Sequence, residues 1–265
     1  MRKIIVSLAP IQANTQIDAI ELAKDVEKSV KAGAAMCHLH CRALDGRLTP
    51  DTSYMITCFE EILKRTDVVV QASTGGISDM DIEKRCYPLN YEKVESASLN
   101  GGSTNLGENV YINSFEDIRY CADVVYKKNI LPEIEVFDIG MLSNIDLIKK
   151  EQPFKEPMLF NLVFGHKGGM QATPQMLSAF SSFVPSDALW GVTHYGRDSW
   201  TFLAAAIAMG ASLVRVGFED STYLEAGVQA KYNYQIVERV VQLIRAMGLE
   251  PASPKETREI LRLDR

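Results

Sequence analysis

The feature that most constrains the fold is a regular alternation of short apolar runs with longer segments of helical periodicity. It continues along the whole chain without a Ser- or Pro-rich linker, and is typical of parallel strands joined by helices. The predicted strands span residues 3–9, 36–42, 67–73, 96–100, 133–138, 158–165, 188–195 and 212–218. The predicted helices span residues 15–31, 51–65, 77–85, 114–129, 140–150, 174–183, 199–209 and 229–247.

Eight strand–helix units predict a closed (β/α)8 barrel, the TIM barrel. Such a barrel typically needs about 250 residues, and the chain has 265. An open, doubly wound sheet is the alternative, but regular units without a longer insertion at a switch point favour closure. We therefore expect a single α/β barrel domain over residues 1–265.

The composition of the chain limits the kinds of molecule that it is expected to bind. The chain has 28 basic and 34 acidic residues, a net charge of −6, which argues against a sequence-independent grip on nucleic acid or anionic lipid. The longest uncharged apolar stretch, residues 202–214, is shorter than the ~20 residues that span a bilayer. Five cysteines without a C-x-x-C pair favour a reducing compartment. We expect a soluble, cytoplasmic protein that binds small molecules or other protein chains.

Two histidines stand close together in the second predicted strand. Strand side chains alternate between faces, so His38 and His40 project to the same side. In a barrel of this kind the reactive groups lie at the carboxyl ends of the strands. Two buried imidazoles that did not share a cation would need two separate hydrogen-bond partners. A metal site is therefore favoured over a hydrogen-bonded core pair.

The eighth predicted strand ends in charged residues. Arg215, Gly217 and Glu219 alternate onto one face, and Glu219 and Asp220 place two carboxylates at the strand exit. In a closed barrel the eighth and second strands both flank the first, so Glu219 can reach a cation held by the two histidines. Two imidazoles and one carboxylate leave coordination positions open, as in a catalytic site. The alternative is a solvated acidic pair in a loop.

Other strand ends carry polar groups as well. Glu133 and Glu135 share one face of the fifth strand, where burial of either is costly without a cation or a reacting proton. The third and fourth strands open into S-T-G-G at 73–76 and S-L-N-G-G-S at 98–103. Gly-rich turns alone are a weak signal, but here their hydroxyl and N–H groups can form a carboxylate cradle. Residues 165–169 are interpreted as a simple turn.

Taken together, these motifs resemble the β-keto acid cleavage enzymes, a family that includes 3-keto-5-aminohexanoate cleavage enzyme. The resemblance follows the chain order and includes the tail at 252–263. The motifs are H-L-H-C-R at 38–42, S-T-G-G at 73–76, S-L-N-G-G at 98–102, P-E-I-E-V-F-D at 132–138 and R-V-G-F-E-D at 215–220.

The resemblance implies a metal-dependent reaction. His38, His40 and Glu219 would bind a divalent metal, usually zinc in this family. Asp220, oriented and kept ionised by Arg215, would remove a proton from C2 of a β-keto acid, giving a metal-stabilised enolate. The family reaction converts acetyl-CoA and a β-keto acid into acetoacetate and a new acyl-CoA. The family also implies a homotetramer.

Further residues are assigned by the same resemblance. Ser73, Ser98 and Asn100 would hold the substrate carboxylate, with Ser98 at a place where a family member has threonine. Glu135 matches an acidic position implicated in the mechanism. Asn14 aligns with a glutamate that receives the substrate ammonium in the 3-keto-5-aminohexanoate enzyme, and asparagine supplies hydrogen bonds but no countercharge. We therefore expect a neutral or polar β-keto acid, unless Asn14 merely shapes the turn.

Alternation puts Arg215 and Asp220 on opposite faces, so pairing of these two residues requires the backbone to turn at Glu219. Other functions remain open at this point. A metal-dependent hydrolase or lyase that acts on a small carboxylate would also use H-x-H, with His166 and His194 as further ligands. The same ligand types serve iron oxygenases. A barrel retained as a metabolite sensor or scaffold is the non-enzymatic alternative.

Overall fold

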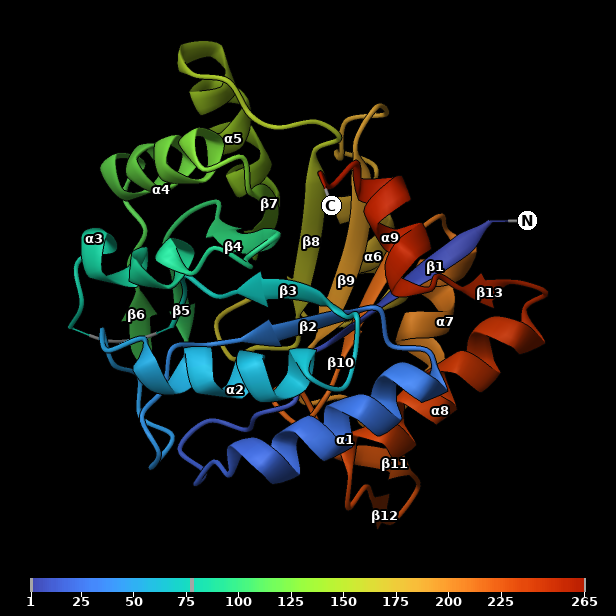
Figure 1. Ribbon diagram of the computed structural model, residues 1–265. Helices are drawn as coiled ribbons and strands as arrows, with labels where there is room; N and C mark the ends of the chain where they lie inside the picture. The colour runs from blue at the N-terminus through green and yellow to red at the C-terminus, as the bar shows by residue number, and fades with distance from the viewer. Residues whose placement is uncertain (1, 77–78, 265) are drawn as a thin grey trace.

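The computed structural model describes residues 2–76 and 79–264, and it is a closed parallel barrel surrounded by helices (Figure 1). The sheet order is β1-β2-β3-β4-β7-β8-β9-β10, and β10 pairs with β1 through Ile5↔Leu213 to Leu8↔Val216. The prediction of a closed barrel is confirmed, because an open sheet would leave these two strands unpaired. The barrel strands are β1 (Lys3–Leu8), β2 (Met36–Leu39), β3 (Val69–Ala72), β4 (Ser96–Asn100), β7 (Leu131–Val136), β8 (Leu159–Phe164), β9 (Leu189–His194) and β10 (Leu213–Val216).

The helices cover the outside of the barrel, and their apolar faces pack on the strands. They are α1 (Ala19–Ala32), α2 (Ser53–Leu63), α3 (Ile82–Arg85), α4 (Phe115–Lys127), α5 (Ile139–Glu151), α6 (Pro174–Ser181), α7 (Thr201–Ala208), α8 (Asn233–Ala246) and α9 (Pro254–Leu261), with a 3-10 turn η1 (Tyr87–Asn90). Among the described residues, none of these helices has the length and apolar character needed to cross a bilayer.

Three helices begin at least four residues later in the chain than predicted. The side chain of Asp18 accepts hydrogen bonds from the N–H groups of Ile20 and Glu21, so α1 begins at Ala19 rather than at residue 15. α8 begins at Asn233 because residues 228–229 form β12. The helix predicted at 77–85 is reduced to α3, capped by Asp81; residues 77–78 lie outside the described part of the chain.

The two ends of the barrel differ in what covers them. At the amino ends of the strands, β13 (Glu250–Pro251) pairs with the first residues of β1, and α9 packs beside it. At the carboxyl ends lie two hairpins that the sequence pattern did not predict, β5 (Thr104–Leu106) with β6 (Asn109–Tyr111) and β11 (Tyr223–Glu225) with β12 (Val228–Gln229). In Figure 1 the arrows of β2 and β3 point toward β5 and β6 and away from α9.

Candidate active site

Three side chains with metal-binding groups converge at the carboxyl end of the barrel. Ligand atoms of His38, His40 and Glu219 lie within 4.8 Å of one another. The Nε2 atoms of His40 and His38 lie 3.2 Å and 4.0 Å from the same oxygen of Glu219, Oε1. Among the described residues no other His, Cys, Asp or Glu joins this cluster, so His166 and His194 do not complete the ligand set of a hydrolase.

A glycine brings Glu219 to this position. β10 ends at Val216, and Gly217 has a φ of 137°, a conformation that favours glycine. A Cβ atom on Gly217 would lie 2.2 Å from the carbonyl oxygen of Ala9. The turn predicted at Glu219 therefore begins two residues earlier, and Arg215 and Glu219 meet through that turn rather than by strand alternation. Beyond it, the N–H of Glu219 donates to Ala9 at 3.1 Å.

Arg215 is the centre of a buried ion-pair cluster. Its Nε and Nη2 donate to both carboxylate oxygens of Asp220, at 3.1 Å and 2.7 Å. Its Nη1 donates to Glu135 Oε1 at 3.2 Å, and Nη2 also reaches Glu219 Oε1 at 3.3 Å. One guanidinium therefore orients three carboxylates around the histidines, and the bidentate pair fixes the plane of Asp220.

The environment raises the pKa of two of these carboxylates and lowers the pKa of the third. Burial raises the pKa of Glu135 to about 7, although Arg215 opposes the shift. Burial also raises the pKa of Asp220, against the attraction of Arg215, which makes Asp220 a stronger base than an ordinary aspartate. For Glu219, burial is outweighed by His40 and Arg215, and its pKa lies well below its usual range. The site thus combines a permanent anion with two carboxylates suited to proton transfer.

The hydrogen bonds of the two imidazoles fit a metal cation. His38 Nδ1 lies 2.8 Å from Gln71 Oε1, and His40 Nδ1 lies 3.1 Å from the carbonyl oxygen of Gly75. His38 Nε2 is buried and has no hydrogen-bond partner, and burial lowers the pKa of His38 to about 3. A buried, neutral imidazole with an unpartnered nitrogen facing Glu219 is a suitable donor for a divalent ion such as zinc.

The predicted carboxylate cradle is assembled in the neighbouring strands. Ser73 Oγ and Ser98 Oγ are 3.3 Å apart. Ser73 accepts from the N–H of Gly75, and Ser98 accepts from the N–H of Thr74. The Nδ2 of Asn100 donates one hydrogen bond to the hydroxyl of Tyr111 at 2.7 Å, and its Oδ1 has no partner. An amide NH2 group has two N–H donors, so the serine hydroxyls and the second N–H of Asn100 can donate to a carboxylate.

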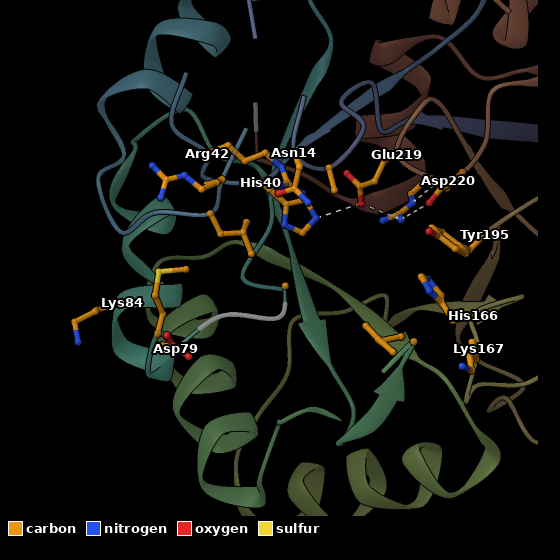
Figure 2. A pocket seen from close by; sticks show the side chains of 18 residues that line it. Asn14, His40, Arg42, Asp79, Lys84, His166, Lys167, Tyr195, Glu219 and Asp220 are labelled. Atoms are coloured by element: carbon orange, nitrogen blue, oxygen red, sulfur yellow. Dashed lines mark hydrogen bonds and ion pairs between the residues drawn. The ribbon is translucent and has the colours of Figure 1, made fainter. Parts of the chain in front are cut away.

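A pocket of about 910 Å³ opens above the cluster. Figure 2 shows Asp220, Tyr195 and His166 on one side of it, and Asp79 and Lys84 at the other. The predicted site residues that line it are Asn14, His40, Arg215, Glu219 and Asp220. The others, His38, Ser73, Ser98, Asn100 and Glu135, are buried and do not line it.

Sequence reasoning missed several residues of the site. His166, assigned to a simple turn, lines the pocket and stacks on Tyr195 with ring centroids 4.0 Å apart. Arg42 also lines the pocket and has a buried Nε without a partner. Gln71 supports His38 from an otherwise apolar strand; the signal was a lone polar residue two positions before Ser73, hence on the same strand face.

Comparisons with known proteins identify the family of the chain. A family model described as beta-keto acid cleavage enzyme matches residues 12–263. The chain is similar to the 3-keto-5-aminohexanoate cleavage enzyme of Fusobacterium nucleatum, with 38% identity over 92% of this chain and 89% of the relative. It is also similar to the 3-oxoadipate:acetyl-CoA acetyltransferase of Cupriavidus necator, with 26% identity over 96% of this chain and 88% of the relative.

A solved structure supports the fold alone. The apo structure of ObcA superposes with a TM-score of 0.81 at 17% identity over 94% of this chain. This chain spans 65% of the ObcA chain. With a family model matched over almost the entire sequence and a relative of this similarity, the chain belongs to the beta-keto acid cleavage enzyme family.

Proposed function

We propose that this chain converts a β-keto acid and acetyl-CoA into acetoacetate and a new acyl-CoA, and that one barrel domain over residues 1–265 does so. The observation that carries the proposal is the convergence of His38, His40 and Glu219 beside the Asp220–Arg215 pair at the base of one pocket. The acetyl-CoA named for the Cupriavidus necator relative supports the choice of co-substrate.

His38, His40 and Glu219 would hold the divalent ion, and zinc suits two nitrogen donors and one oxygen donor. When bound, such an ion supplies a Lewis acid that polarises a carbonyl oxygen. The three residues come from two parts of the barrel, the carboxyl end of β2 and the turn after β10, and His40 and Glu219 line the pocket in which the substrate would bind.

Asp220 would act as the base. It removes a proton from C2 of the β-keto acid, and the C2 carbanion attacks the thioester carbonyl of acetyl-CoA to form a carbon–carbon bond, with the CoA thiolate as leaving group. The thiolate attacks the former keto carbon, and cleavage of the C2–C3 bond releases the new acyl-CoA. The acetoacetate carbanion takes the proton back from Asp220, so atoms and charges balance.

Other side chains would orient the substrate. Ser73 and Ser98 would donate to its carboxylate, together with the second N–H of Asn100. Arg215 would hold Asp220 in place through the bidentate pair. Glu135 would also take part in the mechanism, because its pKa of about 7 suits proton exchange at neutral pH.

The substrate tail would be neutral or polar. Asn14 lines the pocket on the same side as His40, and its amide offers hydrogen bonds but no negative charge to an ammonium group. A homotetrameric assembly and a cytoplasmic location are further parts of the proposal, and they rest on the family resemblance and the cysteine pattern.

The test is incubation of the purified protein with acetyl-CoA and a panel of β-keto acids, with acetoacetate and new acyl-CoA thioesters scored by mass. We expect a thioester whose acyl group matches the β-keto acid supplied, in amounts equal to the acetoacetate formed. Acetyl-CoA consumption without a new thioester would contradict the transfer. Oxygen-dependent turnover would instead indicate an oxygenase.

A further inference from the structure

A chain of side-chain hydrogen bonds crosses the barrel interior next to His38 and is not used by the proposed mechanism. Gln71 Nε2 donates to Glu133 Oε2 at 2.7 Å and to Ser96 Oγ at 3.0 Å. Asn161 Nδ2 donates to the other oxygen of Glu133 at 2.6 Å and to Thr193 Oγ1 at 2.9 Å. These five side chains come from five successive barrel strands and are fully buried.

The direction of each hydrogen bond follows from the chemistry of the groups. A carboxylate can only accept, and both oxygens of Glu133 face amide nitrogens, so Gln71 must present its NH2 group to Glu133. If the Gln71 amide were reversed, its oxygen would face a carboxylate oxygen inside the barrel, and Glu133 Oε2 would lose its hydrogen bond from Gln71. Glu133 therefore fixes the orientation of Gln71.

The orientation of Gln71 in turn fixes the proton on His38. With the amide nitrogen committed to Glu133, the Oε1 atom of Gln71 faces His38 Nδ1 at 2.8 Å. An amide oxygen only accepts, so Nδ1 must carry the proton, and the lone pair of the neutral ring lies on Nε2. His40 makes a different contact, because its Nδ1 faces the backbone carbonyl of Gly75 at 3.1 Å and its Nε2 lies within hydrogen-bond distance of Glu219 Oε1.

We infer that Glu133 is a positioning residue, which acts through Gln71 to hold His38 with its proton on Nδ1 and its Nε2 lone pair toward Glu219. The tautomer is a property of the metal-free protein. Its use in cation binding rests on the proposed function, in which His38, His40 and Glu219 hold a divalent ion. Groups that orient metal-binding histidines in this way typically change metal affinity by about 10–100-fold when removed.

The experiment measures the tautomer and the affinity separately. The full-length, metal-free protein is labelled with ¹⁵N-histidine, and long-range ¹H–¹⁵N spectra at pH 8 identify the protonated nitrogen of His38. Zn²⁺ affinity is measured by competition with a chromophoric chelator. In the wild type we expect a protonated Nδ1 and a bare Nε2.

Three variants test the relay. Glu133→Leu frees the amide of Gln71, and Gln71→Leu removes the acceptor itself; in both we expect His38 to lose the exclusive Nδ1–H form and Zn²⁺ affinity to fall by about 10–100-fold. In the double variant Gln71→Glu/Glu133→Gln, a carboxylate faces His38 directly and the net charge is unchanged. We expect this swap to keep Nδ1 protonated, and to keep Zn²⁺ affinity within a few-fold of the wild type.

Ser7→Ala is the matched control. Ser7 is also fully buried in a barrel strand, beside Arg215 in the register, and its hydroxyl has no partner. We expect an unchanged His38 spectrum and affinity. If Glu133→Leu does not fold, Gln71→Leu and the swap decide the question.

The relay is overturned if wild-type His38 carries its proton on Nε2, or if folded Glu133→Leu or Gln71→Leu keeps both the wild-type tautomer and the wild-type affinity. An Nδ1–H form that depends on Glu133, in a protein that does not bind Zn²⁺, would support the relay and overturn the proposed metal site.

Discussion

The two ends of the barrel are built from the same strands but bury different kinds of side chain. At the amino ends, an apolar layer is completed by the C-terminal segment; it comprises Ile5, Ala35, Met36, Val69, Leu131, Leu159, Leu213, Ala252, Leu261 and Leu263. At the carboxyl ends, a few residues further along, the strands carry His38, Glu135, Arg215 and the polar network around Gln71. The first end is mainly apolar, although it includes the buried Arg258–Glu95 ion pair, whereas the second holds the larger cluster of charges around Arg215. Such buried charges are stable only while each has its partner. Substitutions at the base should therefore affect stability, and substitutions at the mouth should affect chemistry.

The largest expected effect is on turnover at the mouth. His38→Ala should abolish both metal binding and cleavage, because it removes a ligand. Asp220→Asn should keep the metal but lower kcat by about 10²–10⁴-fold, the usual contribution of a general base. Metal content by mass spectrometry and acyl-CoA formation check both variants. Normal cleavage by either one would refute the assigned roles.

The next effect is on stability at the base. Leu159→Ala removes a fully buried side chain from the apolar layer, and we expect a loss of about 2–5 kcal/mol in the free energy of unfolding. Turnover per folded molecule should be unchanged. Leu147→Ala is the control, because Leu147 is 50% exposed on α5 and such a change usually stays within about 0.5 kcal/mol. Urea unfolding gives both values; a lower kcat in folded Leu159→Ala would undermine the division between the two ends.

A smaller effect concerns the pH dependence of stability, and it arises from a buried histidine at the carboxyl end, His194. Burial, followed by Arg197, lowers the pKa of His194 from 6.5 to about 4. The unfolded chain therefore binds this proton more readily, and the stability contributed by neutral His194 is present above pH 6.5 and is lost as the pH falls toward 4. His194→Leu should flatten the stability curve in this window by about 1–3 kcal/mol. Parallel curves for variant and wild type in thermal unfolding between pH 4 and 7 would contradict this.

The smallest expected effect concerns the substrate tail. Asn14 has a φ of 59°, a left-handed conformation that aspartate also tolerates, so Asn14→Asp adds a charge without changing shape. Because exposed ion pairs contribute about 0.2–1 kcal/mol, we expect the ratio of kcat/KM for an amino-substituted over a neutral β-keto acid to rise by up to about fivefold. Competition between the two substrates measures the ratio, and kcat with the neutral one serves as the control. No change would place the tail away from Asn14.

The barrel could be predicted because each strand and helix leaves its own pattern in a short stretch of the sequence. Seven of the eight barrel strands lie within the predicted ranges, and β7 begins at Leu131, two residues before its predicted start. The hairpins β5–β6 and β11–β12 were not predicted, since strands of two or three residues carry too short an alternation to detect. β13 was missed for the same reason, because only its pairing with β1 defines it as a strand.

The candidate ligands could be predicted because their residue types are rare and fall at strand ends. The route by which Arg215 meets Asp220 could not, because it depends on the turn that Gly217 makes against Ala9. Nor could the relay through Gln71 and Glu133, because barrel register decides which buried polar groups become neighbours. The sequence therefore predicted the candidate residues that belong to a motif, but it did not predict residues whose role depends only on contacts between strands.

The pairing of β1 with β10, which closes the barrel, affects when the site can form during synthesis of the chain. Among the barrel strands, β1 is synthesised first and β10 last, and the two pair with each other. Glu219 lies just after β10, and its N–H donates to the carbonyl oxygen of Ala9, just after β1. While the chain is still being synthesised, both histidines precede Glu219, so the three residues of the proposed metal site come together only after β10 and the turn that follows it have been made. Under the proposed function, acetoacetate formation would therefore require that synthesis has passed residue 219.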